Sequence, residues 1–335
     1  MKFEEATRTP SIDETLDEQW LQMQSNYPLR PLGTGIEAIK IREENRSHIH
    51  LIGSTQEGKS KFIEFLIRGD IRRGIGFCLL DPTAGGKTVY DVLKWCCHKK
   101  LEKVCLIDPY HRFQYNKIPG LSPFLYLKDG TKTAKLRETS ISDFGDTIRN
   151  FSGTKDFAET FRIERYLPSV LTALYDAHRP LSDAKYFTNR LYKAQREKIL
   201  DQTDPDTALD LSDAFSTVTM FRDFQSTINR MQRFYKGTLG LMFSAPPINF
   251  MKMIAEGWII LVNLDTGNGF SNPDSRLLGT FIINQIQVAI ERLFSKKREK
   301  NPDTAGRPYY LYIDEASEYA TRKLANARAQ TKDRA

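Results

Sequence analysis

Short apolar runs alternate with longer amphipathic stretches along this chain of 335 residues. The short runs are rich in β-branched, leucine and aromatic side chains and are too short for buried helices, which is typical of parallel strands. Helical periodicity follows most of them, most clearly at Leu277–Phe294. This alternation predicts an α/β fold with a mainly parallel sheet. The predicted strands are Ile49–Ile52, Ile75–Leu80, Val104–Ile107, Trp258–Leu264 and Tyr309–Ile313.

The stretch between Asp108 and Gly257 has no convincing strand and predicts a mostly helical insertion into the α/β core. Turn residues at Arg179-Pro180, Asp204-Pro205 and Ala245-Pro246-Pro247 divide it. We expect an acidic N-terminal extension at 1–40, core segments at 41–108 and 257–335, and the insertion at 109–256. The basic run Lys296–Lys300 is expected to be an exposed loop. The predicted helices are Lys59–Ile71, Thr88–Lys99, Phe157–Ala177, Ser182–Leu200 and Leu211–Phe234.

Composition narrows the class of protein only slightly. A hydrophobic content of 40% is enough for a sizeable core and excludes a disordered scaffold. The net charge of +7 permits a nucleic-acid partner without requiring one. The acidic N-terminus lacks the apolar region of a signal peptide, and no run of 18 apolar residues predicts a membrane span. The four cysteines show no CxxC spacing, and Cys78 and Cys105 lie in apolar runs, which favours buried thiols and a cytoplasmic protein.

The strongest motif is the segment Gly53–Ser60, GSTQEGKS, which matches the pattern G-x-x-x-x-G-K-[ST] between a predicted strand and a predicted helix. Gly53 and Gly58 allow the backbone N–H groups to face a phosphate, and the helix N-terminus adds its positive dipole end. Lys59 would contact the β- and γ-phosphates, and Ser60 would bind Mg²⁺. Glu57 is expected to point away from the anion. The predicted nucleotide-binding residues are Gly53, Ser54, Thr55, Gln56, Glu57, Gly58, Lys59, Ser60 and Lys61.

A second string, Asp81–Thr88, also ends in Gly-Lys-Thr, but Asp81 stands where a phosphate loop needs glycine. We therefore expect it to line the carboxyl edge of the sheet without binding phosphate as the first loop does.

The acidic partner of the phosphate loop is predicted at the end of the last strand, where the run Tyr309–Ile313 is followed by Asp314 and Glu315. Asp314 would hold Mg²⁺, and Glu315 would orient and deprotonate the attacking water. The two carboxylates indicate hydrolysis that drives motion more than a small-molecule kinase.

Two other site hypotheses carry less weight. His48 and His50 share a strand face, but no third ligand lies close enough in the sequence to complete a metal site. Aromatic residues interleave with basic ones between Phe221 and Lys236, which would suit stacking on single-stranded nucleic acid. A helix core with a solvated basic face is the favoured interpretation of that segment.

Taken in order, these motifs resemble the HerA/FtsK-type ATPases, in particular the conjugative DNA-transfer coupling proteins (TraD/TraG-like) and HerA-like helicases. The similarity runs from about Ile41 to Tyr319 and includes RSHIHLIGSTQEGKS, FCLLDPTAGGKTVYDVL, VCLIDP and YYLYIDEASEYAT. The resemblance implies a RecA-like P-loop NTPase core and a ring, usually a hexamer, with ATP and Mg²⁺ between subunits and DNA in the pore. The residues carried over are Lys59, Ser60, Asp314 and Glu315.

The chain departs from the family's pattern in two places. The glycine-rich Thr-Gly-x-Gly form of the loop is Thr55-Gln56-Glu57-Gly58 here. Only twenty residues follow Glu315, so we expect a chain truncated before the family's sensor strand. Arg276 and Arg292 remain as candidates for an arginine that acts on a neighbour's ATP.

The first functional hypothesis is therefore an ATP-dependent DNA translocase, with the helical insertion contacting partners or substrate. The alternatives are a nucleotide-binding assembly or regulatory subunit with little turnover and an ATPase that powers protein export.

Overall fold

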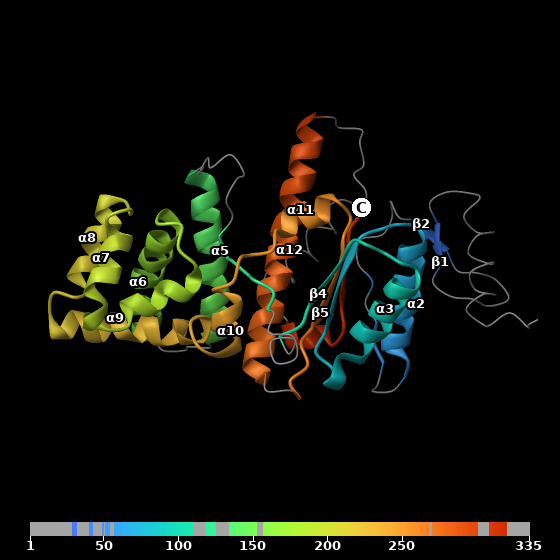
Figure 1. Cartoon of the computed structure of the whole chain (residues 1–335), viewed down its shortest axis with the longest axis horizontal. Coiled ribbons are helices and arrows are strands. Elements are labelled where there is room, and N and C mark those ends of the chain that lie inside the picture. Colours follow the sequence, from blue (N-terminus) through green and yellow to red (C-terminus); the bar gives the residue numbers. More distant parts are fainter. Residues whose placement is uncertain are drawn as a thin grey trace, which may run out of the picture. The chain divides into compact units, whose positions relative to one another are not determined.

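The computed structural model describes two compact units, Met1–Gly74 with Ala325–Ala335 and Ile75–Leu324. We describe each unit by itself (Figure 1). The described residues are 29–31, 40–42, 49, 51–53, 57–109, 118–124, 134–152, 157–267, 270–300 and 308–319.

The described residues of the first unit form a small antiparallel ribbon and one long helix. Strand β1 (Leu29–Pro31) pairs with β2 (Lys40–Arg42). Helix α2 spans Lys59–Arg72, one residue longer than the predicted helix Lys59–Ile71. The predicted strand Ile49–Ile52 is wrong for its described residues, because Ile49, Leu51 and Ile52 have no strand conformation. Ile52 is 95% exposed. An apolar run forms a strand only when a neighbouring strand accepts its backbone hydrogen bonds, and none is described there.

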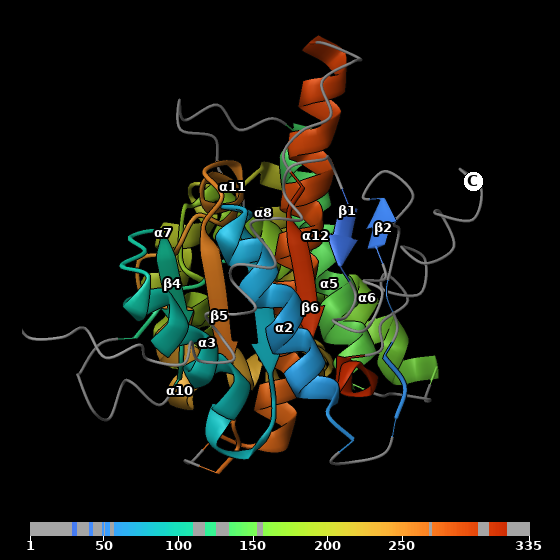
Figure 2. The same ribbon diagram turned by 90° about the vertical axis from the view of Figure 1, so that its right-hand side faces the viewer.

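The second unit is built on a four-stranded sheet of order β4-β5-β3-β6. All three pairings are parallel, with Leu79 of β3 opposite Leu261 of β5 and Tyr312 of β6. Figure 2 shows these strands side by side, with their carboxyl ends at one edge. The predicted parallel sheet is confirmed. The strands are β3 (Phe77–Asp81), β4 (Val104–Ile107), β5 (Ile259–Asn263) and β6 (Tyr310–Ile313).

The two faces of this sheet pack against different helices, because alternate residues of a strand point to opposite sides. Cys78, Leu80 and Ile260 belong to the core that includes α12 (Asn272–Lys300). Helix α3 (Lys87–His98) contacts β3 and β5, and Phe77 and Leu79 on the remaining positions of β3 are fully buried. Burial raises the pKa of Cys105 to about 11, and Cys78 is completely buried, so both thiols are held in their neutral form.

A group of helices joins β4 to β5, which confirms the predicted helical insertion; the residue boundaries assigned to it remain a prediction. In Figure 1, α12 stands between these helices and the sheet. Phe144 of α5 and Phe281 of α12 form an edge-to-face pair 5.9 Å apart, so an aromatic contact joins the two parts. The helices are α5 (Ala134–Ser152), α6 (Phe157–Asp176), α7 (Lys193–Leu200), α8 (Pro205–Asp213), α9 (Val218–Met231), α10 (Gly237–Met242) and α11 (Phe250–Ala255).

Short 3₁₀ segments interrupt the insertion, and their bounds correct several predictions. The predicted helix Ser182–Leu200 is η3 (Leu181–Phe187), η4 (Arg190–Tyr192) and α7. The predicted helix Leu211–Phe234 divides into the end of α8, α9 and η5 (Gln232–Phe234), because Thr217 caps a new helix start. Outside the insertion, the described residues include two more 3₁₀ segments, η2 (Ala84–Gly86) and η6 (Ala316–Tyr319).

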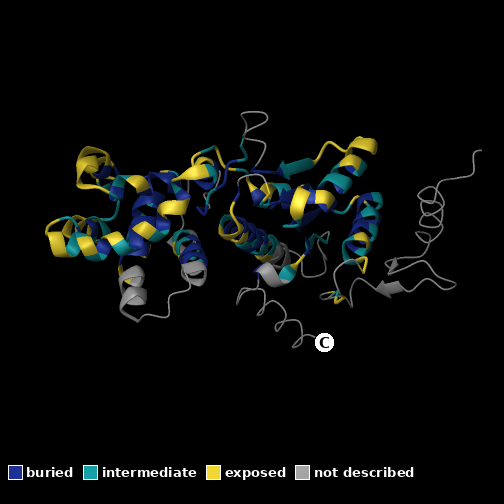
Figure 3. Ribbon diagram, turned by 90° about the horizontal axis from the view of Figure 1, so that it is seen from below, coloured by how far each residue is buried: buried dark blue, intermediate teal, exposed yellow. Residues whose placement is uncertain are grey.

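Two further predictions change in the structure. The basic run Lys296–Lys300 is the last turn of α12 and not a loop, since no glycine or proline lies between Gly279 and Pro302 to end the helix earlier. Phe224 and Phe234, two of the aromatic residues weighed as stacking platforms, are fully buried, so they belong to the core. Figure 3 shows buried residues where helices of the insertion face one another and exposed residues outside. None of the helices among the described residues combines the length and hydrophobicity needed to cross a bilayer.

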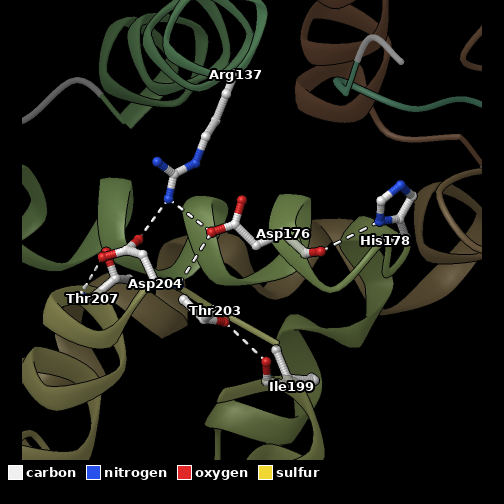
Figure 4. A network of polar contacts seen from close by, with 7 residues as sticks. All are labelled: Arg137, Asp176, His178, Ile199, Thr203, Asp204 and Thr207. Atoms are coloured by element: carbon white, nitrogen blue, oxygen red, sulfur yellow. Dashed lines mark hydrogen bonds and ion pairs between the residues drawn. The ribbon is translucent and has the colours of Figure 1, made fainter. Parts of the chain in front are cut away.

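A charged cluster of Arg137, Asp176 and Asp204, here called the Arg137 network, links three helices of the insertion. The Arg137 guanidinium of α5 donates to Asp176 Oδ2 at the end of α6 (2.8 Å) and to Asp204 Oδ2 at the start of α8 (2.6 Å). Figure 4 shows the side chain reaching between both carboxylates. The other Asp204 oxygen accepts the Thr207 N–H, which caps α8.

Candidate functional site

The phosphate-loop motif lies in the first unit and ends at the start of α2. Gly58 has the left-handed backbone conformation (φ 86°) that glycine adopts without strain, and α2 begins at the next residue, Lys59. No side chain caps this helix start in the described part of the loop. Backbone N–H groups at such a start, with the helix dipole behind them, favour an anion. Ser54, Thr55 and Gln56 lie outside the described residues, as do His48 and His50.

Lys59 folds back over its own loop. Its Nζ donates to the carbonyl oxygen of Gly53, the first fixed glycine of the motif, at 2.8 Å. The Glu57 carboxylate also turns toward the loop, because its Oε2 lies only 2.8 Å from where a Cβ on Gly53 would be. The expectation that Glu57 points away from the bound anion remains a prediction. Lys61 pairs with Glu64 at 2.7 Å, and its contact with a nucleotide remains a prediction.

Four polar residues in the second unit form a line across the carboxyl edge of the sheet, here called the edge row. Their order follows the strands, Asp108, Asn263, Asp81 and Asp314, one at the carboxyl end of each of β4, β5, β3 and β6. The strand registers place all four on the same face, at neighbouring positions. Their exposed fractions are 1%, 4%, 0% and 3%. Buried polar residues of this kind require hydrogen-bond partners.

Asp81 holds the turn that follows its own strand. Its Oδ1 accepts the Thr83 N–H (2.8 Å) and hydroxyl, and its Oδ2 accepts the N–H of Thr88 in the first turn of α3 (3.0 Å). Burial raises the pKa of Asp81, the Thr83 and Thr88 hydrogen bonds oppose this, and the negative charge of Asp314 adds to the increase. The second Gly-Lys-Thr string therefore lies at the sheet edge, as expected.

Asn263 links the other side of the edge row. Its Nδ2 donates to Asp108 Oδ2 (3.1 Å), which also accepts the Tyr90 hydroxyl of α3. Its Oδ1 accepts the Asp265 N–H (3.1 Å), so the amide also fixes the turn after β5. Gly86 packs so closely that a Cβ there would lie 2.5 Å from Asn263 Oδ1.

Asp314 and Glu315 follow β6 directly, as predicted. The Asp314 N–H donates to the Leu80 carbonyl oxygen (3.0 Å), which continues the β3 pairing by one residue. Glu315 has a left-handed backbone (φ 48°), an uncommon conformation for a residue other than glycine, and its N–H donates to Asp314 Oδ1 (3.1 Å). Its side chain is exposed beside a buried carboxylate. Uncommon backbone conformations of this kind concentrate at functional sites.

The oxygen ligands of the second unit suit a hard cation such as Mg²⁺. Among the residues that the structure describes, no group of three or more His, Cys, Asp or Glu side chains could hold a metal ion by itself. Mg²⁺ usually keeps only one or two carboxylates and takes its remaining ligands from phosphates and water. A single buried carboxylate such as Asp314 therefore fits a cation that arrives with a nucleotide.

The predicted site residues divide between the two units, with Gly53–Lys61 in the first and Asp314 and Glu315 in the second. Asp108 and Asn263, two members of the edge row, were not among the predicted site residues. A signal was present, since each of the four strands leads into Asp or Asn, in FCLLD, VCLID, IILVN and YLYID. Of the candidate trans-acting arginines, Arg276 is exposed, whereas burial lowers the pKa of Arg292 against the opposing charge of Asp143.

Comparison with known proteins supports the fold. No protein-family model matches the chain, and no curated protein matches it in sequence. Among solved structures, it is similar to the unbound bacterial conjugative coupling protein TrwBdeltaN70, with a TM-score of 0.58 and 13% identity over 93% of this chain and 66% of that one. For the complex of TrwB with ADP and Mg²⁺, the TM-score is 0.53 and the identity 14%, over 83% of this chain and 59% of that one. For the complex of TrwB with the non-hydrolysable GTP analogue GDPNP, the TM-score is 0.52 and the identity 14%, over 82% of this chain and 58% of that one. The chain spans less than two thirds of each TrwB chain. The likeness confirms the expected RecA-like α/β fold.

Proposed function

We propose that this chain is a subunit of an ATP-driven motor that moves DNA, of the type to which conjugative coupling proteins belong. The fold shared with TrwB over 93% of the chain carries the proposal. Two features of the chain itself support it, namely the phosphate-loop motif at the start of α2 and the buried Asp314 followed by Glu315 at the end of β6.

In this proposal the loop residues bind the nucleotide. The N–H groups at the start of α2 hold phosphate oxygens, and Lys59 exchanges its hydrogen bond with the Gly53 carbonyl for one with the β- and γ-phosphates. Ser60 and Asp314 hold the Mg²⁺ ion that accompanies ATP. Bound Mg²⁺ neutralises charge on the phosphate oxygens.

Glu315 acts on the attacking water in this proposal. Its exposed carboxylate can accept a proton from water, while its backbone N–H is fixed by Asp314. The two adjacent carboxylates then have separate roles: the buried Asp314 holds the cation and the exposed Glu315 holds the water. Both act on the nucleotide that Lys59 binds.

We further propose that DNA is the transported substrate and that the motor assembles as a ring, most simply a hexamer. The resemblance to DNA-translocating ATPases motivates both parts, and the net charge of +7 is compatible with DNA. The helical insertion offers a separate part of the chain for a protein partner. The runner-up functions are the assembly subunit with little turnover and the protein-export ATPase.

DNA-stimulated ATP hydrolysis tests the proposal. The wild-type chain should bind a nucleotide and hydrolyse ATP faster when DNA is added. Lys59→Ala should weaken nucleotide binding, and Glu315→Gln should retain binding while turnover falls by about 10²–10³-fold. Lys87→Ala is the matched comparison, because Lys87 also follows a left-handed glycine at a helix start but belongs to the second string. It should retain nucleotide binding.

The outcomes separate the three candidate functions. Tight nucleotide binding with negligible turnover in the presence of DNA would support the assembly subunit. Turnover that is indifferent to DNA, with no salt-dependent DNA affinity, would favour protein export, because phosphate contacts release counterions and protein contacts need not. A wild-type chain that binds neither nucleotide nor DNA would sink the proposal.

A further inference from the structure

Asp81 and Asp314 are direct neighbours on adjacent strands. Leu80 pairs with Ile313, so the next residues of β3 and β6 are Asp81 and Asp314. They share the face on which Phe77 and Tyr312 form an edge-to-face ring contact at 5.8 Å. Both side chains are buried. Two like charges on neighbouring strands and away from water repel each other more than they would in solvent.

The same Asp81 carboxylate ties down both ends of the turn formed by residues 82–88, here called the β3–α3 turn. Thr83 donates to one of its oxygens and the Thr88 N–H donates to the other. Between these anchors, Gly85 and Gly86 both have positive φ values, of 79° and 55°. The conformation of the turn is therefore held at its ends by a single side chain.

A change of charge at Asp314 reaches the turn through this side chain. A cation held by Asp314 would offset the repulsion between the two carboxylates, so the Asp81 side chain would keep its position and its three donors. Hydrogen bonds to a charged acceptor are stronger than those to a neutral one. Thermodynamic linkage is reciprocal. If a bound cation favours the hydrogen-bonded form of the Asp81 carboxylate by some factor, that form raises the affinity for the cation by the same factor.

We propose that Asp81 is a positioning residue that couples cation binding at Asp314 to the ordering of the β3–α3 turn. The inference rests on the proposed function, because the cation is the Mg²⁺ that a nucleotide brings. Within that function, this coupling gives the sheet edge a second role, because the β3–α3 turn becomes more ordered when Mg²⁺·nucleotide is bound.

Amide hydrogen exchange of the full chain tests the coupling. The probe is a non-hydrolysable ATP analogue, compared with Mg²⁺ and with a chelator. In the wild-type protein, Mg²⁺ should slow exchange at the Thr83 and Thr88 amides by about tenfold, the effect of strengthening a hydrogen bond to a charged group. In Asp81→Asn this slowing should disappear. By reciprocity, the Mg²⁺ concentration for half-saturation should rise by about tenfold in that variant.

Two further variants control the result. Asp91→Asn removes the same charge from α3, where Asp91 faces Lys94 at 3.4 Å, and it should keep the Mg²⁺ effect. Thr83→Val removes only the hydroxyl donor to Asp81 at a partly exposed position. It should reduce the slowing to about threefold, and it serves as the test if Asp81→Asn does not fold.

The design distinguishes failure of the coupling from failure of the proposed function. If the wild-type chain binds the analogue and Asp314→Asn abolishes the Mg²⁺ effect, while Asp81→Asn and Thr83→Val both keep the full slowing, the coupling is overturned and the function stands. If Asp91→Asn also loses the slowing, the effect is a general charge effect and the assignment to Asp81 is overturned. If the wild-type chain does not bind the analogue at all, both proposals are overturned.

Discussion

The edge row and the Arg137 network both gather carboxylates in the second unit, but they balance charge in opposite ways. In the Arg137 network, one guanidinium donates to two carboxylates, so unlike charges meet between helices. In the edge row, Asp81 and Asp314 carry the same charge on adjacent strands, and burial together with the Asp314 charge raises the pKa of Asp81. Unlike charges between helices serve the fold. Like charges held together at a sheet edge lower the stability of the folded state, which is typical of residues that are retained for function.

The largest expected effect comes from exchanging one carboxylate for its amide in each cluster. Asp314→Asn should lower ATP turnover by more than about 10²-fold, because a neutral amide holds a cation poorly. It should leave the free energy of unfolding unchanged or raise it, since one of two repelling charges is removed. Asp176→Asn should keep turnover and lower the free energy of unfolding by about 1 kcal/mol.

Steady-state ATPase assays and urea unfolding on both variants check this crossed pattern. The comparison between the clusters breaks down if Asp314→Asn keeps its turnover, or if Asp176→Asn abolishes turnover without a loss of stability.

A smaller effect is expected from two adjacent glycines of the β3–α3 turn. Gly85→Ala and Gly86→Ala both place a side chain at positive φ, which costs about 1 kcal/mol. A Cβ at Gly85 meets open space, whereas at Gly86 it would lie 2.5 Å from Asn263 Oδ1. Gly86→Ala should therefore lower the free energy of unfolding by about 2–3 kcal/mol in total. Equal losses in urea unfolding would show that Asn263 moves freely, contrary to a rigid edge row.

Much of the core fold could be predicted from the sequence, because buried parallel strands are short apolar runs whatever their order. Val104–Ile107 is observed with the predicted bounds, and the other three strands of the sheet differ by at most two residues at either end. The run Ile49–Ile52 is also mostly apolar, yet its described residues form no strand. Apolar content indicates the tendency to pair but not the presence of a partner.

The helical insertion and the edge row show what the sequence analysis missed and why. Helix α5 was not predicted, although Ile141, Phe144 and Ile148 recur at helical spacing within a largely polar segment. Asn263 bonds to Asp108 across 155 positions of sequence. The two are neighbours only because β4 and β5 pair in that register, and register between distant strands cannot be read from either strand alone. By contrast, the position of Asp314 and Glu315 at the end of a strand could be predicted, because the apolar run Tyr309–Ile313 directly precedes them; their roles remain a prediction.

The smallest expected effect concerns the pH dependence of the Arg137 network. Burial alone would raise the pKa of Asp204, but the Thr207 hydrogen bonds and Arg137 outweigh it and lower the pKa below the ordinary carboxyl value. A lowered pKa stabilises the fold above the ordinary value of about 4 and loses that contribution as pH falls through the folded-state pKa. Arg137→Met should cost about 1 kcal/mol of unfolding free energy at neutral pH, a modest value because Asp204 is partly exposed.

Urea unfolding of Arg137→Met at decreasing pH sharpens the comparison between the two clusters. The difference from wild type should shrink as the pH falls below about 4 and through the lowered pKa of Asp204, because a protonated Asp204 no longer attracts the guanidinium. Arg222→Met, which removes an exposed arginine of α9, is the matched control and should show little loss at either pH. A loss in Arg137→Met that persists unchanged in acid would assign the stabilisation to the packing of the Arg137 side chain and not to its charge. The contrast with the edge row would then rest on Asp81 and Asp314 alone.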